Sequence, residues 1–182
     1  MILVTRNEKK IEEFSKFLGA EIKFKVLKAE YPELRFDSSC EVAMSSAKAL
    51  AEKLKDEVVV EDSGLFIKAL GGFPGTCTRY VHERIGNAGI LKLMKGVRNR
   101  QCEYVSAIGF CAPGKKPMCF RGVEEGRIAE KEKGKNGWGQ DPIFIPKGSK
   151  KTYGETRRRG DINLFRARAI GKLKAFLAQS GK

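Results

Sequence analysis

Apolar and polar positions along the chain follow two patterns, one typical of strands and one of helices. Short β-branched apolar runs predict strands, and apolar positions three and four residues apart predict helices with one buried face. Two acids follow the apolar run that ends at Val60, and in an open α/β sheet such a position lies at the crevice that binds ligands. The expected strands are Ile2–Val4, Ile22–Leu27 and Val58–Val60, and the expected helices run from the N-cap Asn7 to about Leu18 and from Ser39 or Glu41 to Lys55.

The rest of the chain adds an alternating region that is typical of paired strands. We expect strands at Cys102–Phe110, Pro117–Gly122 and Gly126–Glu130, with Pro113-Gly114 turning the first hairpin. Glycine and proline predict two loops, over 71–75 and 137–142. We expect helices at Thr78–Arg84, Ala88–Lys95 and Ile162–Leu177. Since no linker divides the chain, residues 1–182 are expected to form a single domain.

Length and composition narrow the classes of protein. A chain of 182 residues with 41% hydrophobic residues can bury a core, and it has no apolar run of the roughly 20 residues that a membrane helix needs. No signal peptide is expected at the start, so the predicted location is the cytoplasm, with no membrane partner. The five cysteines are scattered and odd in number, which predicts reduced thiols and neither a zinc site nor a disulfide framework.

The formal net charge of +14 predicts an anionic partner. Basic residues concentrate after Lys147, but few aromatic residues accompany them, so a surface that stacks nucleic-acid bases is only weakly supported. The charge alone does not decide, because a charged fraction of 32% is also typical of a heat-adapted surface. His82 is the only histidine and stands apart from every motif below, which disfavours a mechanism that needs a catalytic histidine.

Two adjacent carboxylates, Glu61 and Asp62, follow the apolar run Val58–Val60, with Ser63-Gly64 expected as turn residues. Paired carboxylates repel each other unless a proton or a cation compensates, so this pair is a candidate site for a hard metal ion; the alternative is an ordinary surface turn. The first strand leads directly into a helix whose N-terminus carries Lys9 and Lys10. Such a terminus is a hint of a phosphate site, and no P-loop is present.

Five motifs together make the chain similar to the inosine triphosphate pyrophosphatase family. They are Thr5-x-Asn7-x-x-Lys10, Tyr31-Pro32-Glu33, Glu61-Asp62-Ser63-Gly64-Leu65, Ala69-Leu70-x-Gly72-x-Pro74-Gly75 and Gly137-x-Gly139-x-Asp141-Pro142-x-Phe144. The resemblance covers nearly the whole chain. It implies a long twisted mixed sheet flanked by helices, with two lobes and a central cleft, in a homodimer.

The resemblance also implies an activity, the hydrolysis of ITP, dITP and XTP to the monophosphate and pyrophosphate with Mg²⁺ as cofactor. Water would attack the α-phosphorus, with Glu33 and Asp62 as catalytic residues and as metal ligands, and with Glu61 assisting them at the metal. The implied substrate-binding residues are Thr5, Asn7, Lys10, Lys48, Ser63, Trp138, Gly139, Gln140, Asp141 and Arg166.

The end of the site that would recognise the base departs from the family pattern. Leu164-Phe165 stands where the family usually has Ser-His, Gln140 replaces an aromatic residue, and Gly160 occupies a lysine position. Leucine and phenylalanine cannot hydrogen-bond a purine edge, so base selectivity is expected to be relaxed or redirected, although Trp138 and Phe165 could stack on a base. The alternatives are a Maf-like pyrophosphatase, or a non-catalytic binder of nucleotides or nucleic acid.

Overall fold

The computed structural model describes residues 1–158, 161 and 163–180, and these contain a seven-stranded mixed sheet with α-helices around it. The strands lie in the order β2-β1-β3-β5-β6-β7, with β4 paired to β3. β1 is parallel to β2 and β3, whereas β4 and β7 are antiparallel to their neighbours, so the predicted α/β class with a mixed sheet is confirmed. The strands are β1 (Ile2–Val4), β2 (Lys25–Leu27), β3 (Val58–Ile67), β4 (Pro74–Gly75), β5 (Gln101–Cys111), β6 (Met118–Ile128) and β7 (Phe144–Pro146).

The chain divides into two compact units. The first comprises Met1–Ser63, Ser106–Val123 and Ile162–Lys182, and the second comprises Gly64–Val105 and Glu124–Asp161. The arrangement as one domain with two lobes and a central cleft stays a prediction. None of the helices in the described part of the chain is both long and apolar enough to cross a membrane. The helices are α1 (Glu8–Leu18), α2 (Ser39–Leu54), α3 (Thr78–Leu93), α4 (Tyr153–Thr156) and α5 (Leu164–Gln179), with a 3-10 turn η1 (Lys68–Leu70).

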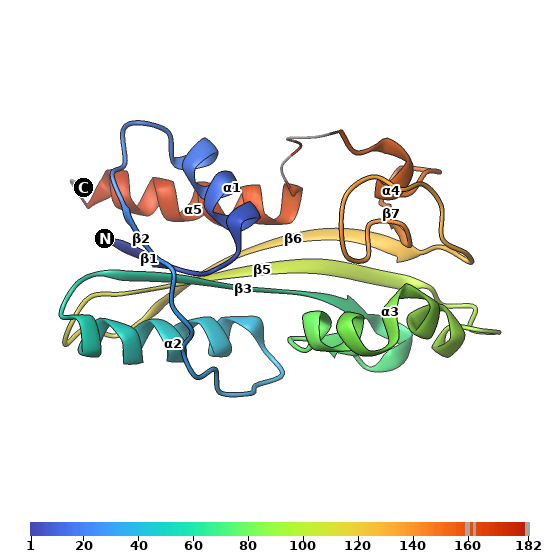
Figure 1. Ribbon diagram of the computed structural model, residues 1–182, viewed down its shortest axis with the longest axis horizontal. Coiled ribbons are helices and arrows are strands. Elements are labelled where there is room, and N and C mark those ends of the chain that lie inside the picture. The colour runs from blue at the N-terminus through green and yellow to red at the C-terminus, as the bar shows by residue number, and fades with distance from the viewer. Residues whose placement is uncertain (159–160, 162, 181–182) are drawn as a thin grey trace. The chain divides into compact units, whose positions relative to one another are not determined.

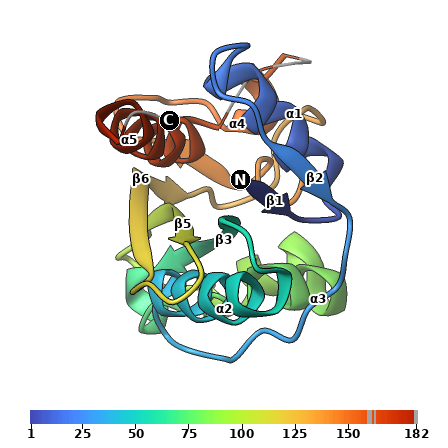
Figure 2. The same ribbon diagram turned by 90° about the vertical axis from the view of Figure 1, so that its left-hand side faces the viewer.

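In the first unit, helices cover both faces of the sheet. α1 and α5 pack against each other on one face, and α2 lies on the other (Figures 1 and 2). The strand β3 serves both cores, because Val59 joins the cluster under α1 and α5 while Val58 and Val60 join the cluster under α2. This confirms that the apolar run before the acid pair is a strand buried on both faces.

Two strands are longer than their sequence patterns predict. Ser63 and Gly64 were expected to form a turn, but β3 continues through them to Ile67. The extension is stabilised by pairing with β4, in which Leu65 lies opposite Gly75. Gly64 is needed there, because a Cβ atom would lie 2.1 Å from the carbonyl oxygen of Gly75. The acid pair is therefore in the middle of a strand. In the same way, the two segments expected around Gly122–Gly126 form the single strand β6.

The second unit is built from α3, β4, α4, β7 and the adjoining parts of three long strands. The two helices expected in its first half form α3, with a break at Gly86, whose φ is +60°. The four-residue helix α4, which starts with a Thr152–Glu155 capping box, was not predicted. Its N-terminal residue Tyr153 stacks on Phe144, with ring centroids 5.5 Å apart.

The prediction of reduced thiols throughout is wrong, because Cys40 and Cys119 form a disulfide. Their sequence positions, 79 residues apart, give no local signal for this bond. The fold brings them together where α2 packs on the sheet, with a Cα–Cα distance of 5.7 Å. The remaining cysteines, Cys77, Cys102 and Cys111, are free thiols.

Candidate active site

The N-terminus of α1 is built as the sequence motif predicts. Asn7 is the N-cap, and its Oδ1 accepts hydrogen bonds from the backbone N–H groups of Lys9 and Lys10 at 3.0 and 3.3 Å. The hydroxyl of Thr5 accepts a hydrogen bond from the backbone N–H of Asn7 at 3.2 Å. Thr5 and Asn7 therefore shape the turn between β1 and α1, where the positive end of the helix dipole favours an anion.

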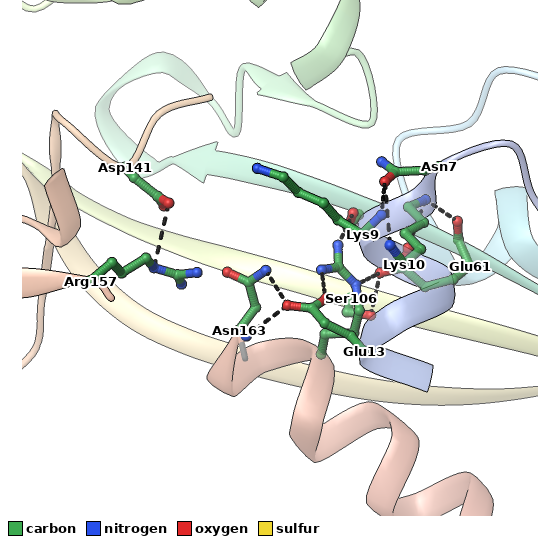
Figure 3. Close-up of polar contacts among 11 residues, drawn as sticks. Asn7, Lys9, Lys10, Glu13, Glu61, Ser106, Asp141, Arg157 and Asn163 are labelled. Atoms are coloured by element: carbon green, nitrogen blue, oxygen red, sulfur yellow. Dashed lines mark hydrogen bonds and ion pairs between the residues drawn. The ribbon is translucent and has the colours of Figure 1, made fainter. Parts of the chain in front are cut away.

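Lys10 is tied to the acid pair. Its Nζ lies 2.7 Å from Oε2 of Glu61 and donates a hydrogen bond to the backbone carbonyl of Glu61, also at 2.7 Å (Figure 3). The other carboxylate oxygen of Glu61 accepts hydrogen bonds from Ser106 at 2.6 Å and from Nε of Arg166 at 3.0 Å. Oε1 of Glu61 is thus held by two hydrogen bonds, whereas Oε2 has no hydrogen-bond partner among the described residues and is compensated by the ion pair with Lys10.

Arg166 is fully buried and pairs with two carboxylates. Besides Glu61, it forms an ion pair with Glu13, and its Nη2 donates to the hydroxyl of Ser63 at 3.2 Å. Glu13 also accepts hydrogen bonds from the backbone and the side chain of Asn163, at 3.0 and 2.8 Å (Figure 3). The predicted substrate-binding arginine therefore lies inside an ion-pair network that links α5, α1 and β3.

The charges of this network stabilise one another. Burial alone would raise the pKa of Glu61, but Arg166 and Lys10 lower that pKa to about 2, so the carboxylate is ionised. Burial opposes the charged form of Arg166, yet the two carboxylates hold the pKa of the guanidinium above its ordinary value. A compensated arrangement of this kind is the condition under which buried charges persist.

Asp62 has the opposite character. Its Oδ2 is buried and has no hydrogen-bond partner among the described residues. Burial raises the pKa of Asp62 from 3.8 to about 6; Ser39 and Lys10 act to lower it, while the charges of Glu61 and Glu33 raise it further. An uncompensated carboxylate oxygen in a buried position is a suitable ligand for a hard cation.

Glu33 is exposed, and its charge raises the pKa of Asp62. The hydroxyl of Tyr31 hydrogen-bonds Glu33, and burial together with that contact raises the pKa of Tyr31. The charges of Glu61 and Glu33 thus both act on Asp62, and the joint role of the three carboxylates at a metal ion stays a prediction. Within the described residues, however, no three acidic, histidine or cysteine side chains are grouped so that they could hold a metal ion by themselves.

Lys48 is exposed on α2. The pKa of Glu52 is lowered mainly by a hydrogen bond from the backbone N–H of Gly114, and the charge of Lys48 is a smaller cause in the same direction. The lysine that most strongly lowers the pKa of Asp62 is Lys10. The buried face of α2 instead presents Ser39 to the acid pair. The role of Lys48 as a phosphate ligand stays a prediction.

The second glycine loop belongs to the other unit. Trp138 is 40% exposed, whereas Gln140 and Asp141 are buried. The carbonyl of Gly139 accepts a hydrogen bond from Asn87 at 3.0 Å, and the backbone N–H of Trp138 donates to Oδ2 of Asp141 at 3.0 Å. Of the four predicted residues, only Trp138 presents a large exposed side chain.

The residues at the predicted base-recognition end of α5 differ in their environment. Leu164 is exposed, but Phe165 is buried, so the expectation that its ring could stack on a base is wrong. The position of Gly160, and that of Ile162, where the last helix was expected to start, lie outside the described residues.

Several residues of the network were not predicted. Glu13 follows Lys10 by three positions, so the helical spacing could have placed both on one face of α1. Ser106 and Asn163 reach Glu61 and Glu13 only through tertiary contacts, and Arg157, which pairs with Asp141, appears in the sequence as one of many basic residues. No local signal distinguishes these three.

Comparisons with known proteins show what the whole chain is similar to. The sequence profile described as the Ham1 family matches residues 1–176. A protein of Korarchaeum cryptofilum named dITP/XTP pyrophosphatase is 42% identical over 181 residues, covering all of this chain and 97% of its own length, and one of the same name from Thermococcus kodakarensis is 39% identical over 187 residues, covering 100% and 99%.

The fold comparison gives the same result. The structure of the Staphylococcus aureus Ham1 protein matches with a TM-score of 0.83 and 27% identity, over 99% of this chain and 100% of that one. The profile matches almost the whole sequence and the relatives are of nearly the same length, so the family resemblance of the five motifs is confirmed. The chain belongs to the Ham1 family.

Proposed function

We propose that this protein is a Mg²⁺-dependent pyrophosphohydrolase that converts dITP, XTP and ITP to the nucleoside monophosphate and pyrophosphate. The observation that carries the proposal is the environment of Asp62, whose carboxylate has one buried oxygen and a raised pKa and feels the charge of Lys10 at a helix N-terminus. The names of the full-length relatives, dITP/XTP pyrophosphatase, support the choice of substrates.

The residues present fit a magnesium ion. Asp62 offers a buried oxygen without a protein partner, and the charge of Glu33 acts on the same carboxylate. Mg²⁺ in nucleotide enzymes is commonly held by one or two carboxylates together with substrate phosphates, so a protein cluster of three ligands is not required. When bound, the ion would neutralise phosphate charge and polarise the phosphoryl group. We assign Glu61 to orienting Lys10 rather than to the metal, because one of its oxygens is held by hydrogen bonds and the other pairs with Lys10.

The chain's own residues supply the other requirements of the reaction. With a pKa of about 6, Asp62 is ionised at neutral pH and can still accept a proton from the attacking water. Lys10, held in place by Glu61, and the N-terminus of α1 would bind phosphate oxygens. The water oxygen bonds to the α-phosphorus, the bond from that phosphorus to the bridging oxygen breaks, and pyrophosphate leaves with the electron pair.

Base selectivity would depend on few polar contacts. Trp138 can stack on a purine, while Leu164 offers only an apolar surface and Arg166 is buried among carboxylates. Sites that discriminate strongly do so through hydrogen bonds that a wrong substrate leaves unpaired. We therefore expect weaker discrimination between oxo-purines and ordinary purines than a polar Ser-His pair would give.

A nucleotide panel tests this proposal. Purified protein with Mg²⁺ is given dITP, XTP, ITP, dGTP and dUTP, and pyrophosphate and orthophosphate are measured separately. We expect pyrophosphate from the oxo-purine nucleotides, lost in Asp62→Asn and kept in the control Asp37→Asn, whose side chain is exposed. The proposal would be refuted if none of the five nucleotides released pyrophosphate.

We also propose, from the family resemblance, that the enzyme is a homodimer. Light scattering of the purified protein checks the oligomer directly. A mass of twice the chain is expected, and a single-chain mass at micromolar concentration would contradict it.

A further inference from the structure

The strongest unexplained feature is a buried ion pair behind the second glycine loop. We propose that Arg157 is a positioning residue that holds the loop Gly137–Asp141, and with it Trp138, through the carboxylate of Asp141. The positioning role depends on the proposed function in one respect, namely that the loop contacts the nucleobase of the substrate. Every residue of the argument lies within the second unit.

The carboxylate of Asp141 organises the loop. Its Oδ2 accepts the backbone N–H of Trp138 at 3.0 Å, and the backbone N–H of Asp141 donates to the carbonyl of Trp138 at 3.2 Å. Gly137 lies so close that a Cβ atom there would be 2.0 Å from the same oxygen, and its φ is +74°. The backbone of Trp138 is thus held by both the side chain and the backbone of Asp141, so a shift of Asp141 would also shift Trp138.

Arg157 determines the place of Asp141. Its Nε lies 3.4 Å from Oδ2 of Asp141, a distance for an ion pair rather than a short hydrogen bond (Figure 3). The two side chains are 7% and 4% exposed, so solvent screens the attraction little. The guanidinium also lies over the ring of Tyr153, with Cζ 4.1 Å from the centroid.

The support behind Arg157 is itself rigid. Tyr153 donates a hydrogen bond from its hydroxyl to Glu124 and stacks on Phe144, and the backbone N–H of Arg157 donates to the carbonyl of Tyr153 at 2.9 Å. A planar guanidinium can stack on the ring and pair with the carboxylate at the same time, which a lysine cannot reproduce. Arg157 therefore acts in the interior, although the sequence presents it in a basic run.

Fluorescence tests the proposal without substrate, because Trp138 is the only tryptophan. In Arg157→Gln, we expect emission at longer wavelength and stronger quenching by acrylamide, since the indole, which is 40% exposed, would become more exposed. The matched control is Arg158→Gln, the exposed neighbour, which should keep the wild-type spectrum. A folded Arg157→Gln protein with the wild-type spectrum would overturn the proposal.

Two further variants separate positioning from general destabilisation. Arg157→Lys keeps the charge, so it should fold even if Arg157→Gln does not. We expect its emission to shift in the same direction as that of Arg157→Gln, but by less. An unchanged spectrum would again count against the proposal. Adding Asp141→Asn to Arg157→Gln removes the unpaired carboxylate, so the double variant should be no worse than Arg157→Gln alone. Additive losses in the double variant would show that Arg157 does not act through Asp141.

Kinetics give a readout that a merely structural role would not produce. We expect Arg157→Gln to raise KM for XTP about tenfold with kcat changed less than about twofold, because the loop would bind the base while the phosphate groups stay in place. A fall of kcat by about tenfold at unchanged KM would contradict this expectation. If the emission changes as expected but no variant, wild type included, releases pyrophosphate, the proposed function fails and the positioning role stands.

Discussion

Replacing Asp62 by asparagine should make the metal-free protein more stable while it removes activity. Burial raises the pKa of Asp62 from 3.8 to about 6. One pKa unit corresponds to about 1.4 kcal/mol, so the ionised carboxylate destabilises the folded state by about 3 kcal/mol. Between about pH 4 and pH 6, the folded protein keeps the proton of Asp62 while the unfolded chain loses it. The free energy of unfolding of the wild type therefore falls across that window because of Asp62, and the loss persists at higher pH.

Urea denaturation in the presence of EDTA measures the effect. At pH 8, Asp62→Asn should raise the free energy of unfolding by up to about 3 kcal/mol, and at pH 4, where Asp62 is protonated in the folded wild type, the gain should nearly vanish. Asp37→Asn, a change of the same chemistry at an exposed position, should shift stability by less than about 0.5 kcal/mol at either pH.

Metal addition extends the same experiment. Mg²⁺ at about 100 times its dissociation constant should stabilise the wild type by about 2.7 kcal/mol and Asp62→Asn by much less, because only the carboxylate is a strong ligand. The reasoning is refuted if Asp62→Asn is no more stable than wild type at pH 8, or if its gain is the same at pH 4 and pH 8.

Three further outcomes can be checked separately. With saturating Mg²⁺, kcat/KM should rise with pH through an acid limb at or below pH 6. The proposed base, Asp62, has a pKa of about 6 without metal, and a bound cation lowers that pKa because it favours the charged form. A limb near pH 8 would contradict this assignment. Glu13→Gln should lower the free energy of unfolding by about 3 kcal/mol in urea titrations, since it breaks one half of the buried pairing of Arg166, and a loss below about 0.5 kcal/mol would show that the pair contributes little. Cys40→Ser should lower stability by about 4 kcal/mol under oxidising conditions and very little in reducing buffer, with Cys77→Ser as the control that leaves the disulfide intact; equal stability of Cys40→Ser and wild type without reductant would mean that the bond does not form.

The parts of the fold that depend on neighbouring residues could be predicted. Asn7 caps α1 through its own side chain, and Val58–Val60 alternate between two cores because successive strand residues face opposite sides. The length of β3 could not be predicted, because residues 63–67 are held extended by pairing with β4. Local pattern carries no information about such a partner.

The same limit applies to the site. The acid pair could be located from sequence, but the different states of its two members could not. Glu61 is ionised because Arg166, 105 residues away, and Lys10 reach it, whereas Asp62 is left with a bare oxygen. The disulfide between Cys40 and Cys119 and the inward turn of Arg157 likewise result from packing between distant segments.

Hydrolysis of XTP in ¹⁸O-labelled water is the most direct test of the proposed reaction. Mass spectrometry of the products shows which phosphorus the water attacked. Attack at the α-phosphorus predicts one labelled oxygen in the monophosphate and none in pyrophosphate, dependent on Mg²⁺ and absent in Asp62→Asn. Label in pyrophosphate or orthophosphate, or no hydrolysis at all, would contradict the account.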